Sequence, residues 1–279
     1  MTQRSATPER VGPLSLLRPR RKAPWPIEFY RSAVGKKWVM ALTGIALLGF
    51  VLAHLVGNLK LYLSKEDMNL YGEALRDLGG HLVPRSVTLW ILRGGLIAAF
   101  ALHLHAAYTL TRLNHRARPV QYRSRRDYVA ANFASRTMRW TGVIVFAYLG
   151  FHLADLTWGS ANPHFLRGDP YNNLIYSLQR PAVALSYAVA NIALGVHLLH
   201  GVGSLFQSLG VSNPRIAELR TRIAQGFTAV VVLGNLSFPL LVQLHVVESE
   251  CPGAEPTQPC DEQSPGDDYS TAQADSSTP

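Results

Sequence analysis

Cysteine is almost absent from this chain of 279 residues, and charged side chains are scarce. The two cysteines, Cys251 and Cys260, lie close together near the C-terminus. An iron–sulfur cluster held by this chain alone is excluded, because such clusters need about four thiolates. The two cysteines could form a disulfide or stay free thiols. Charged residues make up 16% of the chain, whereas soluble domains have about a quarter, so a single soluble core is not expected.

The chain has instead five apolar blocks of about twenty residues, the length that a helix needs to cross a bilayer. Residues 1–37 form a basic arm, 38–247 a transmembrane domain, and 248–279 an acidic tail whose composition is typical of disorder. No internal repeat is recognised. The five spans are expected at 37–62, 86–113, 139–158, 181–207 and 225–247.

The positive charge is distributed unevenly between the two sides of these spans. Segments 1–37, 112–139 and 208–224 hold twenty of the 27 Lys and Arg residues, whereas segments 63–85 and 159–181 hold five and the tail none. Positive residues favour the cytoplasmic side. We therefore expect a protein of the plasma (inner) membrane with a cytoplasmic N-terminus and an external tail. The net charge of +9 is explained in this way, and nucleic acid is not expected as a partner.

Histidines inside the spans fall at two depths. His54 and His152 lie eight and six residues from the outer ends of their spans, about 10 Å deep at about 1.5 Å per residue. His103 and His197 lie seventeen and sixteen residues from theirs, about 25 Å deep by the same rise. Ionisable side chains inside a bilayer are usually functional and face a bundle interior.

Pairs of histidines from different helices are typical of haem ligation. A low-spin haem iron takes two axial ligands, and neutral imidazole is a common one. We expect an all-α membrane protein, a bundle of five transmembrane helices of which four carry haem ligands. His54 and His152 would hold an outer haem, and His103 and His197 an inner haem. A zinc site would instead gather three or four ligands in one sphere.

The second span offers two histidines for the inner layer, His103 and His105. They point about 200° apart on a helix, so only one of them can face the inner haem. His103 is favoured by its depth and its alanine neighbours, and His105 stays open as the alternative ligand. Gly57 and Gly201, one turn beyond two of the other ligands, would leave room for a porphyrin.

Two further ionisable residues lie within the spans. Arg93 could neutralise a propionate of the outer haem or extend to the membrane interface. Asp155 lies one turn beyond His152. It would either pair with Arg93 or relay protons for quinone chemistry.

The segments around these histidines resemble the single-chain, di-haem cytochrome b subunit of succinate dehydrogenase and fumarate reductase. The stretch 29–63 carries Ser-x-x-Gly-Lys-Lys, then Met-Ala-x-Thr-Gly, then His-Leu-x-Gly-Asn. LTRLNHRARPVQY at 110–122 resembles the loop after the second helix of that family. FHLADL at 151–156 and HLLHGVGSLFQSLG at 197–210 resemble the third and fourth helices. Together the segments touch the first four spans in the family's order.

The resemblance implies a five-helix membrane anchor with two haem b groups, bound on its cytoplasmic face by a flavoprotein and an iron–sulfur subunit. Electrons from succinate would pass through these partners to a membrane quinone, menaquinone or ubiquinone. This chain would not itself bind succinate, and the complex could form homo-oligomers. The haem ligands of the family fall on His54, on His103 or His105, on His152 and on His197. The acidic tail is not part of the pattern.

Two other functions stay open. A di-haem cytochrome b that serves a formate dehydrogenase or a hydrogenase would have similar histidine layers, and the copurifying partner would distinguish it. A transporter without haem could line a polar path with histidines, and its purified chain would show no haem absorbance.

Overall fold

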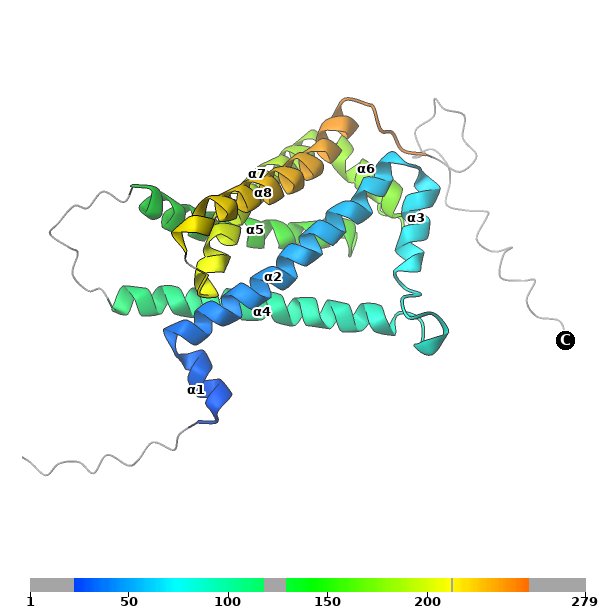
Figure 1. Cartoon of the computed structure of the whole chain (residues 1–279). Helices are drawn as coiled ribbons and strands as arrows, with labels where there is room; N and C mark the ends of the chain where they lie inside the picture. Colours follow the sequence, from blue (N-terminus) through cyan, green and yellow to red (C-terminus); the bar gives the residue numbers. More distant parts are fainter. Residues whose placement is uncertain (1–22, 118–128, 212, 251–279) are drawn as a thin grey trace, which may run out of the picture.

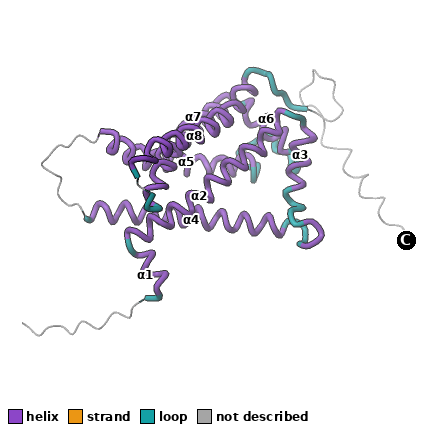
Figure 2. Tube along the Cα trace, in the orientation of Figure 1, coloured by secondary structure: helices purple, strands orange, loops and turns teal. Residues whose placement is uncertain are grey.

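The computed structural model describes residues 23–117, 129–211 and 213–250, and every regular element in these ranges is a helix (Figures 1 and 2). The expected all-α fold is therefore confirmed over the described ranges. Most of the predicted arm and nearly all of the predicted tail, with Cys251 and Cys260, lie outside them. The elements are α1 (Trp25–Arg31), α2 (Ala33–Asn58), η1 (Leu59–Tyr62), α3 (Lys65–Ala74), η2 (Gly80–Leu82), α4 (Val87–Arg116), α5 (Val129–Leu156), α6 (Pro170–Gln179), α7 (Pro181–Ser208) and α8 (Pro214–Gln243).

Within the described ranges, four helices are long and apolar enough to cross a membrane: the run Ala33–Tyr62, which joins α2 to η1, and α4, α7 and α8. The predicted third span falls on α5, which has 28 residues but is not among these four. None of the most apolar stretch of α4 is buried within the protein. Ile91 and Ile97 on this helix expose 68% and 67% of their surface. Soluble monomers rarely expose so continuous an apolar face, whereas lipid chains would cover it.

Local sequence signals explain where several helices begin. The Ser32 hydroxyl accepts the Gly35 N–H at the start of α2, and the Asp169 carboxylate accepts the Asn172 N–H at the start of α6. Both are N-caps of the kind that satisfy first-turn amides. Proline opens α6, α7 and α8, where its missing N–H costs no hydrogen bond. Helix α8 starts at Pro214 rather than near residue 225, because hydropathy marks the apolar part of a helix and misses its polar first turns.

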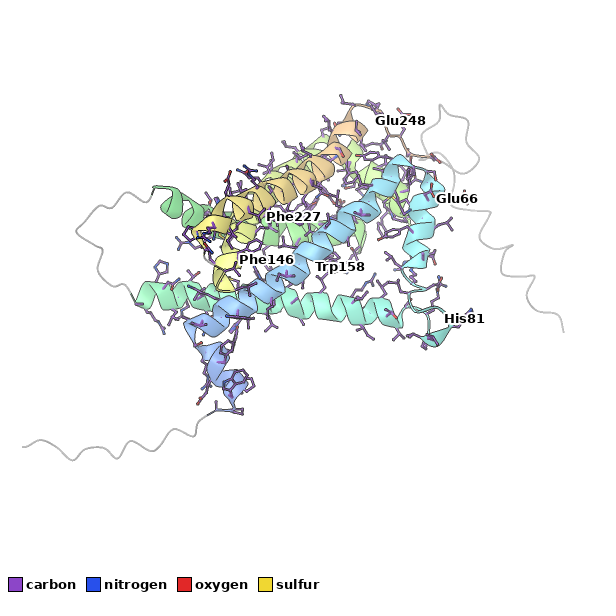
Figure 3. The ribbon with its side chains drawn as sticks, viewed as in Figure 1. Glu66, His81, Phe146, Trp158, Phe227 and Glu248 are labelled. Carbon is purple, nitrogen blue, oxygen red and sulfur yellow. The ribbon has the colours of Figure 1, made fainter. Side chains whose placement is uncertain are left out.

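The segments predicted as the outer loops contain two helices, α3 and α6, which pack together at one end of the bundle (Figure 1). We call this the capped end. Figure 3 shows Glu66 of α3, His81 and Glu248 at this end. Eight of the ten residues of α6 are buried. The main cluster of buried apolar side chains also lies here, and its members are Leu55, Leu61, Met68, Tyr171, Leu174, Ile175, Leu178, Tyr187, Phe238 and Val242.

The long helices pack as two pairs, α2 with α4 and α5 with α7, and α2 also contacts α7. Helix α8 lies along α7 (Figure 1). Their approach is close at Gly195, where an added Cβ would lie 2.5 Å from Cγ2 of Val232. The four helices with the predicted ligands are therefore linked by contacts in the order α4, α2, α7 and α5.

Candidate functional site

His54 of α2 and His152 of α5 meet near the capped end. Their ring centroids are 6.0 Å apart, and the ring planes stand at 88°. A metal–imidazole bond is about 2 Å long, so two imidazoles on opposite sides of one metal atom have centroids about 6 Å apart. The pair that the sequence predicts is therefore brought together at a separation that fits one metal atom. An aromatic ring one turn earlier on each helix, Phe50 and Tyr148, flanks each imidazole.

His103 of α4 and His197 of α7, the residues predicted as the second pair, lie farther from the capped end. Each faces a glycine of the neighbouring helix. A Cβ added at Gly44 would lie 3.7 Å from Cε1 of His103, and one added at Gly142 would lie 3.5 Å from Cε1 of His197. The backbones of α2 and α5 therefore approach these rings closely.

A threonine orients each imidazole of the second pair. Thr43 Oγ1 lies 3.2 Å from Nδ1 of His103, and Thr141 Oγ1 lies 3.4 Å from Nδ1 of His197. Each hydroxyl donates its own hydrogen to the backbone carbonyl four residues earlier, at 2.7 Å. Because its own hydrogen is used in this way, each hydroxyl oxygen accepts the imidazole Nδ1–H. The Nε2 lone pair of each histidine is then free to bind a metal.

The two helix pairs repeat this geometry, which corrects the expectation that the chain has no internal repeat. Thr43 and Gly44 precede His54 as Thr141 and Gly142 precede His152, at an offset of 98 residues. Met40 and Phe50 correspond to Met138 and Tyr148 at the same offset. Each histidine pair takes one member from α2–α4 and one from α5–α7. In the sequence the repeat consists of a Thr-Gly pair followed by a His. It is hard to recognise, because the apolar residues between these positions differ between the two copies.

His105 points to a different part of the protein. Its Nδ1 lies 2.5 Å from the hydroxyl of Tyr30 on α1, and the two rings stack with centroids 5.8 Å apart. The structure thus places His103 beside Thr43 and Gly44 of α2, and His105 beside α1.

The interpretation of Gly57 as room for a porphyrin is wrong. A Cβ at this position would lie 2.6 Å from Cε1 of Tyr71 on α3, so the space beside Gly57 is filled by that ring. Around Gly201 no atom lies within 4 Å of an added Cβ among the described residues.

The expected pairing of Asp155 with Arg93 is also wrong. Asp155 is fully buried, and its Oδ1 accepts a hydrogen bond from Nη2 of Arg180 at 2.6 Å. Arg93 instead lies over the ring of Trp90 on its own helix, 5.1 Å from the centroid. Arg180 was missed because it precedes α7 in a segment predicted to be an outer loop. Only the packing of α6 brings it back to the end of α5.

Each pair offers two protein ligands, so the remaining positions around a metal would have to come from a cofactor. Within residues 23–117, 129–211 and 213–250, no group of three or more His, Cys, Asp or Glu side chains is placed to hold a metal ion. A porphyrin supplies four nitrogens in a plane and needs two axial ligands, which suits a pair. No family model, curated protein or solved structure matches this chain.

Proposed function

We propose that this chain is the membrane-anchor cytochrome b subunit of a succinate:quinone oxidoreductase and that it binds two haem b groups. His54 and His152 hold the outer haem, and His103 and His197 hold the inner haem. The observation that carries the proposal is that His54 and His152, from two different long helices, meet at a separation that fits one metal atom. In this proposal α5 also crosses the membrane, which brings the number of spans to five.

The residues around the pairs fit a planar iron cofactor. Gly44 and Gly142 bring backbone rather than side chains against the inner imidazoles. Thr43 and Thr141 hold the inner rings with Nε2 free. When bound, the haems supply one-electron transfer between the partner subunits and quinone. The chain itself fixes the axial ligands, surrounds them with apolar side chains and separates the two sites by depth.

Charge at the two ends of the bundle supports an orientation. Near the end opposite the cap, the described residues include nine cations: Arg31, Lys36, Lys37, Arg112, Arg116, Arg139, Arg215, Arg220 and Arg222. The described residues near the capped end include six: Lys60, Lys65, Arg76, Arg85, Arg167 and Arg180. Positive residues favour the cytoplasm, so the uncapped end is cytoplasmic in this proposal and receives the flavoprotein and the iron–sulfur subunit. Menaquinone or ubiquinone would exchange electrons within the membrane.

Purification from membranes in a mild detergent tests the proposal. We expect two haem b per chain in a reduced-minus-oxidised spectrum, together with a flavoprotein and an iron–sulfur protein. His54→Ala and His152→Ala should each remove the outer haem and leave the spectrum of the inner one. His81→Ala, at an exposed position of η2, is the matched control and should keep both.

Two results would contradict the proposal. A colourless chain would exclude haem and favour a transporter. A molybdenum or nickel protein in place of the flavoprotein would assign the same haem sites to a formate dehydrogenase or a hydrogenase.

A further inference from the structure

A chain of buried hydrogen bonds leads from His152 to a carboxylate. Nδ1 of His152 lies 3.3 Å from the hydroxyl of Tyr187, and that hydroxyl donates to Oδ2 of Asp155 at 2.8 Å. Ser177 also donates to Oδ2, and Arg180 binds Oδ1. Asp155 and Ser177 are fully buried, and Tyr187 is 5% exposed.

The direction of these hydrogen bonds follows from the number of available hydrogens. An ionised carboxylate only accepts, so the single hydroxyl hydrogen of Tyr187 goes to Asp155. The Tyr187 oxygen is then an acceptor for the Nδ1–H of His152. The Nε2 lone pair of His152 is then free to bind a metal. The imidazole is also a stronger electron donor, because Tyr187, which accepts its Nδ1–H, is itself hydrogen-bonded to the carboxylate of Asp155.

The network distinguishes the two pairs of imidazoles. In the His103–His197 pair the acceptors are threonine hydroxyls, which donate to neutral backbone carbonyls. For His152 the acceptor is a phenol that donates to a charged group. At the position that corresponds to Asp155 in the first repeat stands Gly57, and the ring of Tyr71 fills that space. The carboxylate therefore serves one histidine of one pair.

Building on the proposed function, we propose that Asp155 is a positioning residue of the outer haem site, which acts through Tyr187 on His152 and lowers the midpoint potential of the outer haem. Reduction adds an electron to the haem. A buried negative charge nearby, together with a more strongly donating ligand, stabilises the oxidised form. Arg180 offsets part of this charge, but it binds the carboxylate oxygen on the side away from Tyr187 and is itself 31% exposed.

Redox titration of the purified complex, followed by absorbance and by electron paramagnetic resonance of the two oxidised haems, tests this role. Asp155→Asn keeps the shape and removes the charge, and Tyr187→Phe keeps the ring and removes the link. Both should raise the midpoint potential of the outer haem and leave that of the inner haem unchanged. Thr141→Val is the reciprocal control, because it should change the signal of the inner haem alone.

The alternative is that the network only ties α5, α6 and α7 together. In that case Asp155→Asn and Tyr187→Phe would lower the temperature of thermal unfolding while both potentials stay at their parental values, and the proposal would be overturned. Loss of both haems in both variants would overturn it as well. Selective loss of the outer haem in Asp155→Asn would support it, because the inner haem then reports an intact bundle.

The same experiment separates this inference from the proposed function. A parental complex without haem defeats both. A parental complex with two haems, whose outer potential is insensitive to both substitutions, defeats only the role of Asp155.

Discussion

The hydroxyl of Tyr30 lies 2.5 Å from Nδ1 of His105, so this histidine links the short helix α1 to α4. His103, two residues earlier, points about 200° away on the same helix. It meets Thr43 of α2 instead. One helix therefore presents two histidines to two different neighbours, and their roles can be separated by mutation.

Replacing the two histidines one at a time should give opposite results. We expect His105→Ala to keep two haems per chain, because its ring contacts α1, and His103→Ala to keep only one. The haem-to-protein ratio of purified protein measures this. Loss of haem in His105→Ala, with two haems retained in His103→Ala, would reverse the ligand assignment.

The glycine that faces His197 should not tolerate a large side chain. At Gly142 a Cβ alone would be in ordinary contact with the imidazole, at 3.5 Å, but the branched end of a leucine would enter the site. Gly142→Ala should therefore keep the inner haem, and Gly142→Leu should lose it while keeping the outer one. Gly94→Leu is the control, since Gly94 lies about 180° from His103 around α4 and no atom of the described residues lies within 4 Å of a Cβ added there. Equal haem content in both leucine variants would contradict this reading of the site.

A charge on the exposed face of α4 distinguishes a lipid-facing helix from a water-facing one. Ile97→Lys should lower the amount of protein in the membrane fraction, because a lysine near the centre of a spanning helix costs about 2.5–3.5 kcal/mol. Leu82→Lys should have no effect, since Leu82 is 94% exposed in the segment between α3 and α4. Parental levels of Ile97→Lys, measured by immunoblot, would argue that water covers this face.

The contact between α3 and α6 at the capped end should affect the stability of the fold more than the binding of haem. Asp169 accepts the Asn172 N–H at the start of α6 and binds Asn69 and Lys65 of α3. Loss of an N-cap alone costs about 0.5–2 kcal/mol. Asp169→Ala should therefore lower the temperature of thermal unfolding in detergent with an unchanged haem spectrum. Arg167→Ala, a nearby exposed position, is the control. An unchanged unfolding temperature in Asp169→Ala would show that the α3–α6 contact holds without this cap.

Hydropathy and histidine depth predict much of this architecture. The apolar blocks correctly locate the helices α2, α4, α7 and α8, because burial in lipid requires a long run of apolar residues whatever the tertiary contacts. Counting residues along the helices also places His54 and His152 at one level, and they meet there. The depth of a residue in the membrane can be predicted from the sequence, because an α-helix advances by a fixed rise for each residue.

Contacts between segments far apart in the chain cannot be predicted by counting residues along a helix. Helices α3 and α6 have mixed polar and apolar compositions, and they form because each packs against the other and against the ends of the long helices. The partner of Asp155 depends on that packing, so depth along the helix favours Arg93 and does not indicate Arg180. The space beside Gly57 cannot be predicted from its own helix either, because Tyr71, which fills it, comes from α3.

The repeated helix pairs have a consequence for how the two sites can differ. A symmetric dimer of one two-helix chain would place identical residues on both sides of each histidine pair. A single continuous polypeptide has no such restriction, since the residues of one helix pair can be substituted without the same change in the other. Asp155, at the position that corresponds to Gly57, is such a divergence, and it gives the imidazoles near the capped end a different electrostatic environment from His103 and His197.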